Sequence, residues 1–340
     1  MQRRSLLLLV AAGTVAVVLA LVAIGRGDRE ISRAPPGEPA LPGLAARLGD
    51  LAWLRLSRGA MRVNFAVVNG RWSVVEKGNY PAAAERVRRL LLGLADLTLV
   101  EPKTDRSELL ARLDLDDPSN GKSTEIALQD RTGEALGALI IGRRRPDSLG
   151  GGDAGVYVRR PGSDQAWLAR GAFDLAGDAT SWLDRRILDL APARIATVVL
   201  TAADGTALVL NRASADLPFA VDGAPADAKL KGPASLAAPA AALEALDLVD
   251  VRPAAEMPIA TAGVATAAFT TFDGLVVGLR LMPPGGGDWV AIDATGFGPG
   301  AEAAKPLSAR LSRWSFAVPA ETAKLLRTIL ADLRRPADGS

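Results

Sequence analysis

The sequence predicts an α+β protein in which an N-terminal transmembrane helix is followed by two repeated units, each an antiparallel sheet with a packed helix. Three observations support this prediction. Ser5–Ile24 is apolar and contains no charged residue. Short apolar runs flank Asn-Gly and Asp-Gly pairs, a pattern typical of β-hairpins. Leu94–Pro102 resembles Ala245–Pro253 without a gap, which indicates a duplicated unit. We therefore expect an anchor, a linker, a first unit and a second unit at residues 1–25, 26–43, 44–190 and 191–335.

The apolar segment Ser5–Ile24 is long enough to cross a membrane as a helix, because about 20 residues span the hydrocarbon core. A cleaved signal peptide usually has an apolar region of about 7–15 residues, so we expect a retained anchor. Cleavage near Ala23-Ile24-Gly25 is the alternative. Only two residues precede Arg3 and Arg4, and the short end is easily retained inside. We therefore expect a single-pass inner-membrane protein with a cytoplasmic N-terminus and a periplasmic folded part.

The segment Gly25–Pro42 separates the anchor from the folded part. It contains four prolines and little apolar character, so it is expected to be extended or disordered.

The first unit is expected to begin near Leu44 and to place two hairpins around one helix. Asn69-Gly70 readily adopts the positive φ angles of a type I′ turn. The helix follows Tyr80-Pro81, and its apolar side chains recur on one face with charged side chains opposite. The expected elements are strands Phe65–Val68 and Arg71–Val75, helix Ala82–Leu97, strands Glu125–Gln129 and Ala135–Ile141, and strands Val156–Arg159 and Ala166–Ala169.

The second unit is expected to repeat this order of elements in shortened form. Asp204-Gly205 and Asp273-Gly274 are its hairpin turns. Chance similarity in a chain rich in Ala and Leu is the alternative to duplication. The expected elements are strands Ile195–Leu200, Ala207–Leu210, Ala267–Phe272 and Leu275–Leu281 and a closing helix, Pro319–Leu333. In the gapless match, Asp96, Leu97, Val100 and Pro102 fall on Asp247, Leu248, Val251 and Pro253.

The chain contains neither histidine nor cysteine. A Ser-His-Asp triad cannot be built, and zinc and iron sites of the usual kinds are excluded. Asp114, Asp116 and Asp117 are clustered carboxylates, but Pro118 stands where a calcium loop needs its third ligand, so we interpret them as a turn. We accordingly predict no catalytic residue, no metal, no cofactor and no enzymatic activity.

Three short motifs match known patterns only literally. Gly150–Gly155 fits the dinucleotide pattern, but it precedes a strand, so no helix N-terminus meets a phosphate. Gly121-Lys122-Ser123 resembles the end of a P-loop, yet Asp116 occupies the position of the first glycine. Ser119–Lys122 fits S-x-x-K, but its Asn-Gly pair favours a tight turn and the partner motifs are absent. None of the three predicts a site.

Arginine pairs and triplets recur along the chain. Nucleic acid is not an expected partner, because the net charge is only +2 and aromatic residues make up 4%. We interpret the clusters as solvated faces, with contact to anionic lipid headgroups as the alternative. We expect Trp182–Arg186 to close the first unit, with Trp182 packed and Asp184 paired. The clusters are Arg143–Arg145, Arg159-Arg160, Arg185-Arg186 and Arg334-Arg335.

Several short segments stand in a fixed order along the chain. They are Tyr80-Pro81-Ala82, Val100-Glu101-Pro102, Leu115–Pro118, Ile141-Gly142, Val156–Arg159, Trp182–Leu188 and Trp314-Ser315-Phe316. In this order they resemble a bacterial family of single-pass envelope proteins, domain of unknown function 4340 (DUF4340). The resemblance covers nearly the whole chain after the linker, and Asp114 departs from it where a glycine is expected. Similar proteins accompany gliding-motility-type ABC transporters and their auxiliary subunits.

This resemblance implies a non-catalytic role, and it supplies no catalytic residues to carry over. The first functional hypothesis is a membrane-anchored periplasmic accessory protein of an ABC-type transport or envelope complex, which binds a partner protein. The second is an envelope module that binds a lipid or a glycan through its arginine-rich faces. The third is a hydrolase that uses carboxylates or Ser and Lys.

Overall fold

The computed structural model describes residues 37–145, 154–225 and 228–335. The expected anchor Ser5–Ile24 and the first part of the linker lie outside the described residues. Within the described ranges, no helix combines the length and the apolar character needed to cross a membrane.

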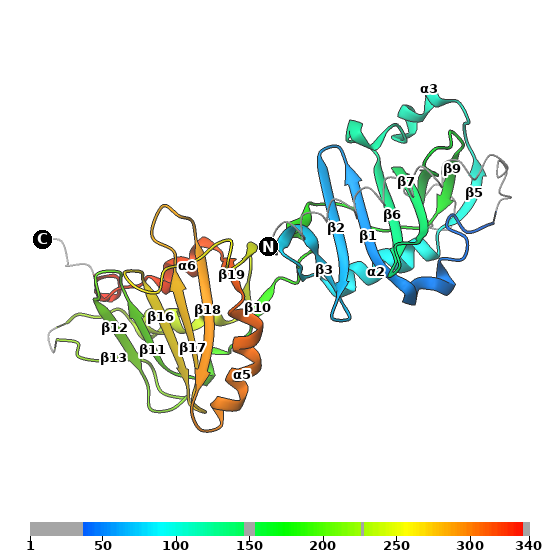
Figure 1. The fold of residues 1–340 in the computed structure, drawn as a ribbon. Helices are drawn as coiled ribbons and strands as arrows, with labels where there is room; N and C mark the ends of the chain where they lie inside the picture. The colour runs from blue at the N-terminus through cyan, green and yellow to red at the C-terminus, as the bar shows by residue number, and fades with distance from the viewer. Residues whose placement is uncertain (1–36, 146–153, 226–227, 336–340) are drawn as a thin grey trace, which may run out of the picture. The chain divides into compact units, whose positions relative to one another are not determined.

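The chain forms two compact units, Met1–Asp184 and Arg185–Ser340 (Figure 1). Both combine helices with antiparallel sheets, so the expected mixed fold class is confirmed. The division falls before the expected boundary at residue 190. The reason is that strand β10, Arg186–Leu188, pairs with β14, Leu246–Asp247, and therefore belongs to the second unit.

Unit 1 is built on a nine-stranded sheet with the order β4-β3-β2-β1-β6-β7-β8-β9-β5. The first hairpin is confirmed: Asn69 and Gly70 have φ angles of 51° and 76°, as a type I′ turn requires. The strands are β1 Leu51–Arg58, β2 Met61–Val68, β3 Arg71–Val74, β4 Tyr80–Pro81, β5 Thr98–Pro102, β6 Thr124–Asp130, β7 Ala135–Arg145, β8 Gly155–Arg159 and β9 Ala166–Arg170.

The principal helix of unit 1, α2, spans Ala84–Ala95, shorter than the expected Ala82–Leu97. It begins later because Ala82 bridges to Leu183 and the Ala83 N–H donates to the Trp182 carbonyl. Its expected apolar face is buried and consists of Val87, Leu90, Leu91 and Leu94. The other helices are η1 Ala45–Asp50, η2 Val75–Lys77, α3 Ser107–Leu110, η3 Ala111–Leu113, η4 Pro118–Asn120 and η5 Ala179–Trp182.

The core of unit 1 lies on one face of this sheet. Alternate side chains of β1 and β6 point to the same side, because successive residues of a strand face opposite ways. Leu54, Leu56, Ile126 and Leu128 are at most 1% exposed on that face. Thr124 and Arg58 continue the same alternation at the ends of β6 and β1. The side chains on the core-facing side of the sheet are therefore polar at this end.

Unit 2 is built on an eight-stranded sheet with the order β13-β12-β11-β16-β17-β18-β19-β15. Its two expected hairpins, β11–β12 and β16–β17, are confirmed. Both sheets share one order: the third, second and first strands of the initial hairpin region, then four strands, and then the strand that ends the matched sequence segment. Unit 1 has β4 in addition at its other edge. The strands are β11 Ile195–Thr201, β12 Ala207–Asn211, β13 Ala220–Val221, β15 Asp250–Pro253, β16 Thr266–Thr271, β17 Leu275–Leu281, β18 Trp289–Gly296 and β19 Trp314–Ala317.

The helices of unit 2 depart from the sequence prediction. The expected closing helix Pro319–Leu333 is wrong in its second half: α6 spans Ala320–Leu326, and the chain is extended at Ile329 before η8, Leu330–Leu333. The Thr328 hydroxyl donates to the Leu325 carbonyl at 2.8 Å, which competes with helical hydrogen bonding there.

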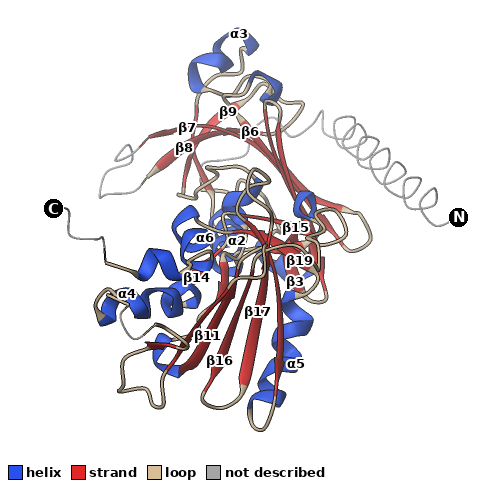
Figure 2. Cartoon of the chain, turned by 90° about the vertical axis from the view of Figure 1, so that its left-hand side faces the viewer, coloured by secondary structure: helices blue, strands red, loops and turns tan. Residues whose placement is uncertain are grey.

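The longest helix of unit 2, α5, was not expected from the sequence. It spans Gly300–Leu311, contains Pro306 in its interior and packs along β17 and β18 (Figure 2). A proline in the interior removes a helical hydrogen bond and obscures the sequence signal. At the position that corresponds to α2, unit 2 has only short helices, namely α4 Pro233–Ala237 and η7 Ala238–Leu243. A 3-10 turn, η6 Pro192–Arg194, precedes β11.

Candidate functional site

The three clustered carboxylates of unit 1 do not converge. Asp114 ends η3, and its Oδ2 lies 3.0 Å from Arg143 Nε. Asp116 accepts a hydrogen bond from Asn120, and Asp117 caps η4 by accepting the Ser119 N–H at 2.9 Å. That backbone hydrogen bond holds the pKa of Asp117 below its ordinary value. No set of acidic residues in the described ranges could hold a metal ion.

Of the other literal motifs, the structure describes Ser119–Lys122 but only the end of Gly150–Gly155. Ser119 lies in η4, and Gly121 follows with a φ of 84°, so the S-x-x-K segment is a tight turn as expected. The glycine-rich segment Gly150–Gly155 lies mostly outside the described residues.

The arginines of the clusters belong to both units, and most of those described make local hydrogen bonds or ion pairs. Arg143 pairs with Asp114, whereas Arg145 donates to the Tyr157 hydroxyl at 3.3 Å. Arg159 donates to the Leu115 carbonyl at 2.6 Å, and burial lowers its pKa. In unit 2, Arg186 pairs with Asp247 at 2.6 Å. These side chains mostly fasten loops and strands.

Trp182 closes unit 1 as expected. It is fully buried, its ring meets Phe65 edge to face at 5.2 Å, and the Arg86 guanidinium stacks on it at 4.0 Å. Asp184 was expected to form an ion pair through its side chain, but the contact that the structure shows is through its backbone: the Asp184 N–H donates to the Pro81 carbonyl at 2.9 Å. Within the described ranges, its carboxylate makes no ion pair.

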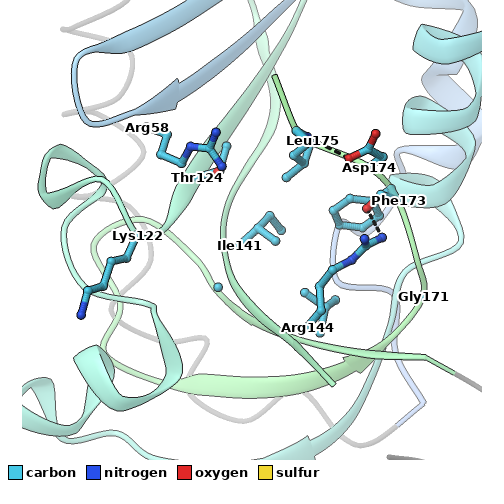
Figure 3. A pocket seen from close by; sticks show the side chains of 12 residues that line it. Arg58, Lys122, Thr124, Ile141, Arg144, Gly171, Phe173, Asp174 and Leu175 are labelled. Carbon is cyan, nitrogen blue, oxygen red and sulfur yellow. Dashed lines mark hydrogen bonds between the residues drawn. The ribbon is translucent and has the colours of Figure 1, made fainter. Parts of the chain in front are cut away.

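One cavity of unit 1 combines apolar walls with cationic side chains (Figure 3). It has a volume of about 210 Å³ and lies at the ends of β1, β6 and β7, where the chain after β9 folds over the sheet. Ile141, Val156, Phe173 and Leu175 form its apolar part. Arg58, Lys122, Thr124 and Arg144 supply its polar groups.

The cations of this cavity come from three separate segments. Arg58 ends β1, Lys122 precedes β6, and Arg144 lies near the end of β7. The chain after β9, residues 171–176, covers the cavity and is called the covering segment. The Arg144 guanidinium donates to the Phe173 carbonyl, which holds this segment against the sheet. In Figure 3, Arg58 lies beside Thr124, whereas the Lys122 side chain extends away from the two arginines and marks the rim.

Among the residues that the structure describes, the single carboxylate that lines the cavity is already engaged. Asp174 Oδ2 lies 3.1 Å from Arg86 Nη2, and its Oδ1 accepts the Ala176 N–H at 2.9 Å. Arg58, Lys122 and Arg144 form no ion pair with any residue that the structure describes. The lining therefore carries uncompensated positive charge beside apolar side chains, an arrangement that suits an anion with an apolar portion.

The sequence patterns did not predict this cavity. Arg144 stood out only as part of the cluster Arg143–Arg145, and Lys122 only as part of the rejected Gly121-Lys122-Ser123 and Ser119–Lys122 motifs. The pairing of β1 with β6 and of β6 with β7 brings Arg58, Thr124 and Ile141 together, and no local pattern reports such pairing. One signal was present: Arg58 follows Leu54 and Leu56 at alternate positions, which places a cation on the core-facing side of the strand.

A second cavity, in unit 2, is predominantly apolar. Its volume is about 180 Å³, and its lining includes Leu200, Val264, Met282 and Leu326. The charged side chain at its wall, Arg327, lies 2.9 Å from Asp288 Oδ1 and donates to the Met282 carbonyl. This cavity therefore provides an apolar surface for a ligand, but among its described lining residues it has no unpaired cation for an anion.

Comparison with known proteins gives one match. A family model described as "Domain of unknown function (DUF4340)" matches residues 72–263, more than half of the chain. No curated protein and no solved structure matches the sequence.

Proposed function

The chain belongs to the DUF4340 family, as its motifs predicted, and we propose that it is a non-catalytic accessory protein of an ABC-type transport or envelope complex. In this proposal Ser5–Ile24 anchors it in the inner membrane with a cytoplasmic N-terminus. The linker then holds both folded units in the periplasm, where they bind a partner protein.

The observation that supports partner binding most directly is a pair of exposed aromatic rings in unit 2. Phe272 and Phe297 are 46% and 63% exposed, and both lie at the Asp273-Gly274 turn. Their backbones are held in place: the Phe297 N–H donates to the Gly274 carbonyl, and the Phe272 N–H donates to the Arg194 carbonyl, each at 3.0 Å. Exposed apolar groups on an ordered backbone are typical of protein contact surfaces.

Affinity purification tests this proposal. The tagged full-length chain, extracted from membranes in mild detergent, is expected to retain ATPase and permease subunits of a transporter. The double variant Phe272→Ser/Phe297→Ser is expected to lose them, whereas Leu92→Ser, an exposed position on α2, is expected to keep them. Purification of the wild-type chain without any transporter subunit contradicts the proposal.

The topology has its own test. Protease added to spheroplasts is expected to degrade the folded units and to leave a short membrane-embedded stub. Full protection places the folded units in the cytoplasm, and a mature N-terminus at Arg26 shows a cleaved signal peptide. Either result contradicts the retained anchor.

We also infer that the two units are copies of one ancestral unit. The common strand order of the two sheets supports this inference. The differing positions of α2 and α5 require that the helices changed after the duplication.

A second candidate function, an envelope module that binds a lipid, is favoured by the cationic cavity of unit 1. A glycan is the less suitable ligand, because sugars are commonly bound on exposed rings and the one aromatic side chain of this cavity, Phe173, is 9% exposed.

A further inference from the structure

We propose that the cavity at the ends of β1, β6 and β7 binds a phosphate group, carried either by an anionic phospholipid headgroup or by a small soluble phosphate. The proposal deepens the second candidate function and rests on it, and it is independent of the partner surface at Phe272 and Phe297. Three features of the cavity support it: its charge, the donor geometry of its arginines and the apolar side chains beside them.

The unpaired cations of the cavity favour an anion with several acceptor oxygens, which is the character of a phosphate group. Arg58, Lys122 and Arg144 line the cavity without an ion pair among the described residues, whereas Asp174 is already paired with Arg86 at 3.1 Å. Cations that line one cavity repel each other, and an anion bound in that cavity offsets the repulsion. A phosphomonoester brings up to two negative charges and a phosphodiester brings one, and both present several acceptor oxygens, so either can serve more than one of these donors at once.

The residue types fit the same ligand. A guanidinium presents a planar fork of N–H donors that matches two phosphate oxygens, and an ammonium on a flexible stem reaches a phosphate as a point charge. Arg58 lies beside the Thr124 hydroxyl, which adds a neutral donor (Figure 3). Lys122 at the rim is exposed and free to turn toward a ligand that enters from solvent.

The cavity is also partly built before any ligand arrives. Arg144 is held by the Phe173 carbonyl, and the covering segment is fastened again where Arg86 contacts Asp174 and the Ala176 carbonyl. Ile141, Val156 and Leu175 lie beside the cations, so a ligand with an apolar portion next to its phosphate buries that portion. The acylated glycerol of a phospholipid has this character, and so does a short alkyl phosphate ester.

The test measures binding by the full-length chain in a nonionic detergent, using isothermal titration calorimetry. The probes are dihexanoyl phosphatidylglycerol, dihexanoyl phosphatidylcholine, glycerol 3-phosphate and inorganic phosphate. Saturable binding of phosphatidylglycerol alone identifies a lipid headgroup as the source, and binding of glycerol 3-phosphate or inorganic phosphate identifies a soluble one. Equal binding of phosphatidylcholine, or no binding of any probe, overturns the proposal.

Neighbouring arginines provide a matched pair of variants. Arg144→Gln and Arg58→Gln are each expected to weaken binding by about tenfold or more, because each removes a charged donor. Arg143→Gln, one residue away but paired with Asp114, is expected to change it less than about twofold. Equal weakening by Arg143→Gln and Arg144→Gln would mean that only the overall charge matters, which contradicts a built site.

Arg144→Gln also removes the contact to Phe173, so its melting temperature has to be compared with that of the wild type. Arg58 makes no hydrogen bond or ion pair within the described ranges, so Arg58→Gln is expected to leave the melting temperature unchanged. A well-folded Arg58→Gln that binds as tightly as the wild type therefore refutes the site. Retention of the transporter subunits by the same variants separates this outcome from failure of the accessory function.

Discussion

Pro102 lies directly opposite Trp167 across the antiparallel strands β5 and β9. The same relationship recurs in unit 2, where Pro253 lies opposite Trp314 across β15 and β19. Both prolines are on the last strand of their sheets, and an edge strand tolerates a residue that cannot donate a hydrogen bond. Two sheets that end in the same pair, in the same register, support the proposed duplication.

The correspondence weakens toward the start of the matched segments. Val251 lies opposite Phe316 in a regular ladder, but a bulge between Leu99 and Glu101 leaves Val100 without a direct partner on β9. Further back, Leu94 lies in α2, whereas Ala245 has a φ of 48° outside any helix. The sequences align without a gap, yet only their carboxyl-terminal halves take the same structure.

The buried face of α2 gives the first prediction. Leu91 is 8% exposed and its neighbour Leu92 is 40% exposed. Leu91→Asp buries a charge in the core of unit 1 and is expected to lower the free energy of unfolding by about 4 kcal/mol or more. Leu92→Asp is expected to lower it by less than about 1 kcal/mol. Urea unfolding of both variants, followed by circular dichroism, measures the difference, and equal losses would contradict the assigned helix face.

Gly142 gives a second prediction, because the turn Leu113–Asp114 packs on it. A Cβ at position 142 would lie 2.4 Å from the Leu113 carbonyl oxygen and 2.7 Å from that of Asp114. Gly142→Ala is therefore expected to cost about 1–3 kcal/mol in urea unfolding, since backbone atoms must move. Gly49→Ala, where a Cβ meets nothing within 4 Å, is the matched control and is expected to be neutral or slightly stabilising.

Asp114 itself has a left-handed backbone, with a φ of 54°. The family resemblance suggested glycine here, and this conformation explains why glycine suits the position. Asp114→Gly is expected to change the free energy of unfolding by less than about 1 kcal/mol, because relief of strain offsets loss of the exposed Arg143 pair. Asp114→Val is expected to lose about 1–2 kcal/mol more, since a branched side chain disfavours this region. Equal stability of the two variants in urea would show that the backbone changes at this turn.

The sequence predicted local structure well and long-range structure poorly. Hairpins around Asn69-Gly70 and Asp273-Gly274 are set by adjacent residues, so their turn chemistry was sufficient. Helix α5 was missed because Pro306 and several small residues hide its periodicity. The cationic cavity was not predicted because Arg58 and Arg144 line the same cavity only as a result of the pairing of β1, β6 and β7. The anchor Ser5–Ile24 stays a prediction.

The last prediction concerns acid stability, which Asp130 is expected to influence. Its Oδ1 accepts the Thr132 hydroxyl at 2.7 Å as well as the N–H groups of Thr132 and Glu134, and its Oδ2 lies 3.1 Å from Arg47. The Thr132 hydroxyl is the largest of the influences that hold the pKa of Asp130 below its ordinary value of 3.8. Folding therefore favours the ionised carboxylate.

The sign of the effect follows from this lowered pKa. The stabilisation is fully present above the ordinary pKa of 3.8, which the carboxyl has in the unfolded chain, and is lost as the pH falls through the lower pKa of the folded protein. Asp130→Asn is accordingly expected to be less stable than the wild type at pH 6, and the two urea midpoints are expected to converge as the pH falls below 3.8. Asp105→Asn, which removes an exposed carboxylate without a hydrogen bond or ion pair in the described ranges, is expected to follow the wild type throughout. A constant offset between Asp130→Asn and the wild type from pH 6 into the acid range would show that the carboxylate's charge does not contribute. Its hydrogen bonds would then act through their geometry alone, and the contact of Arg47 with the buried Asp130 side chain would have a negligible effect on stability.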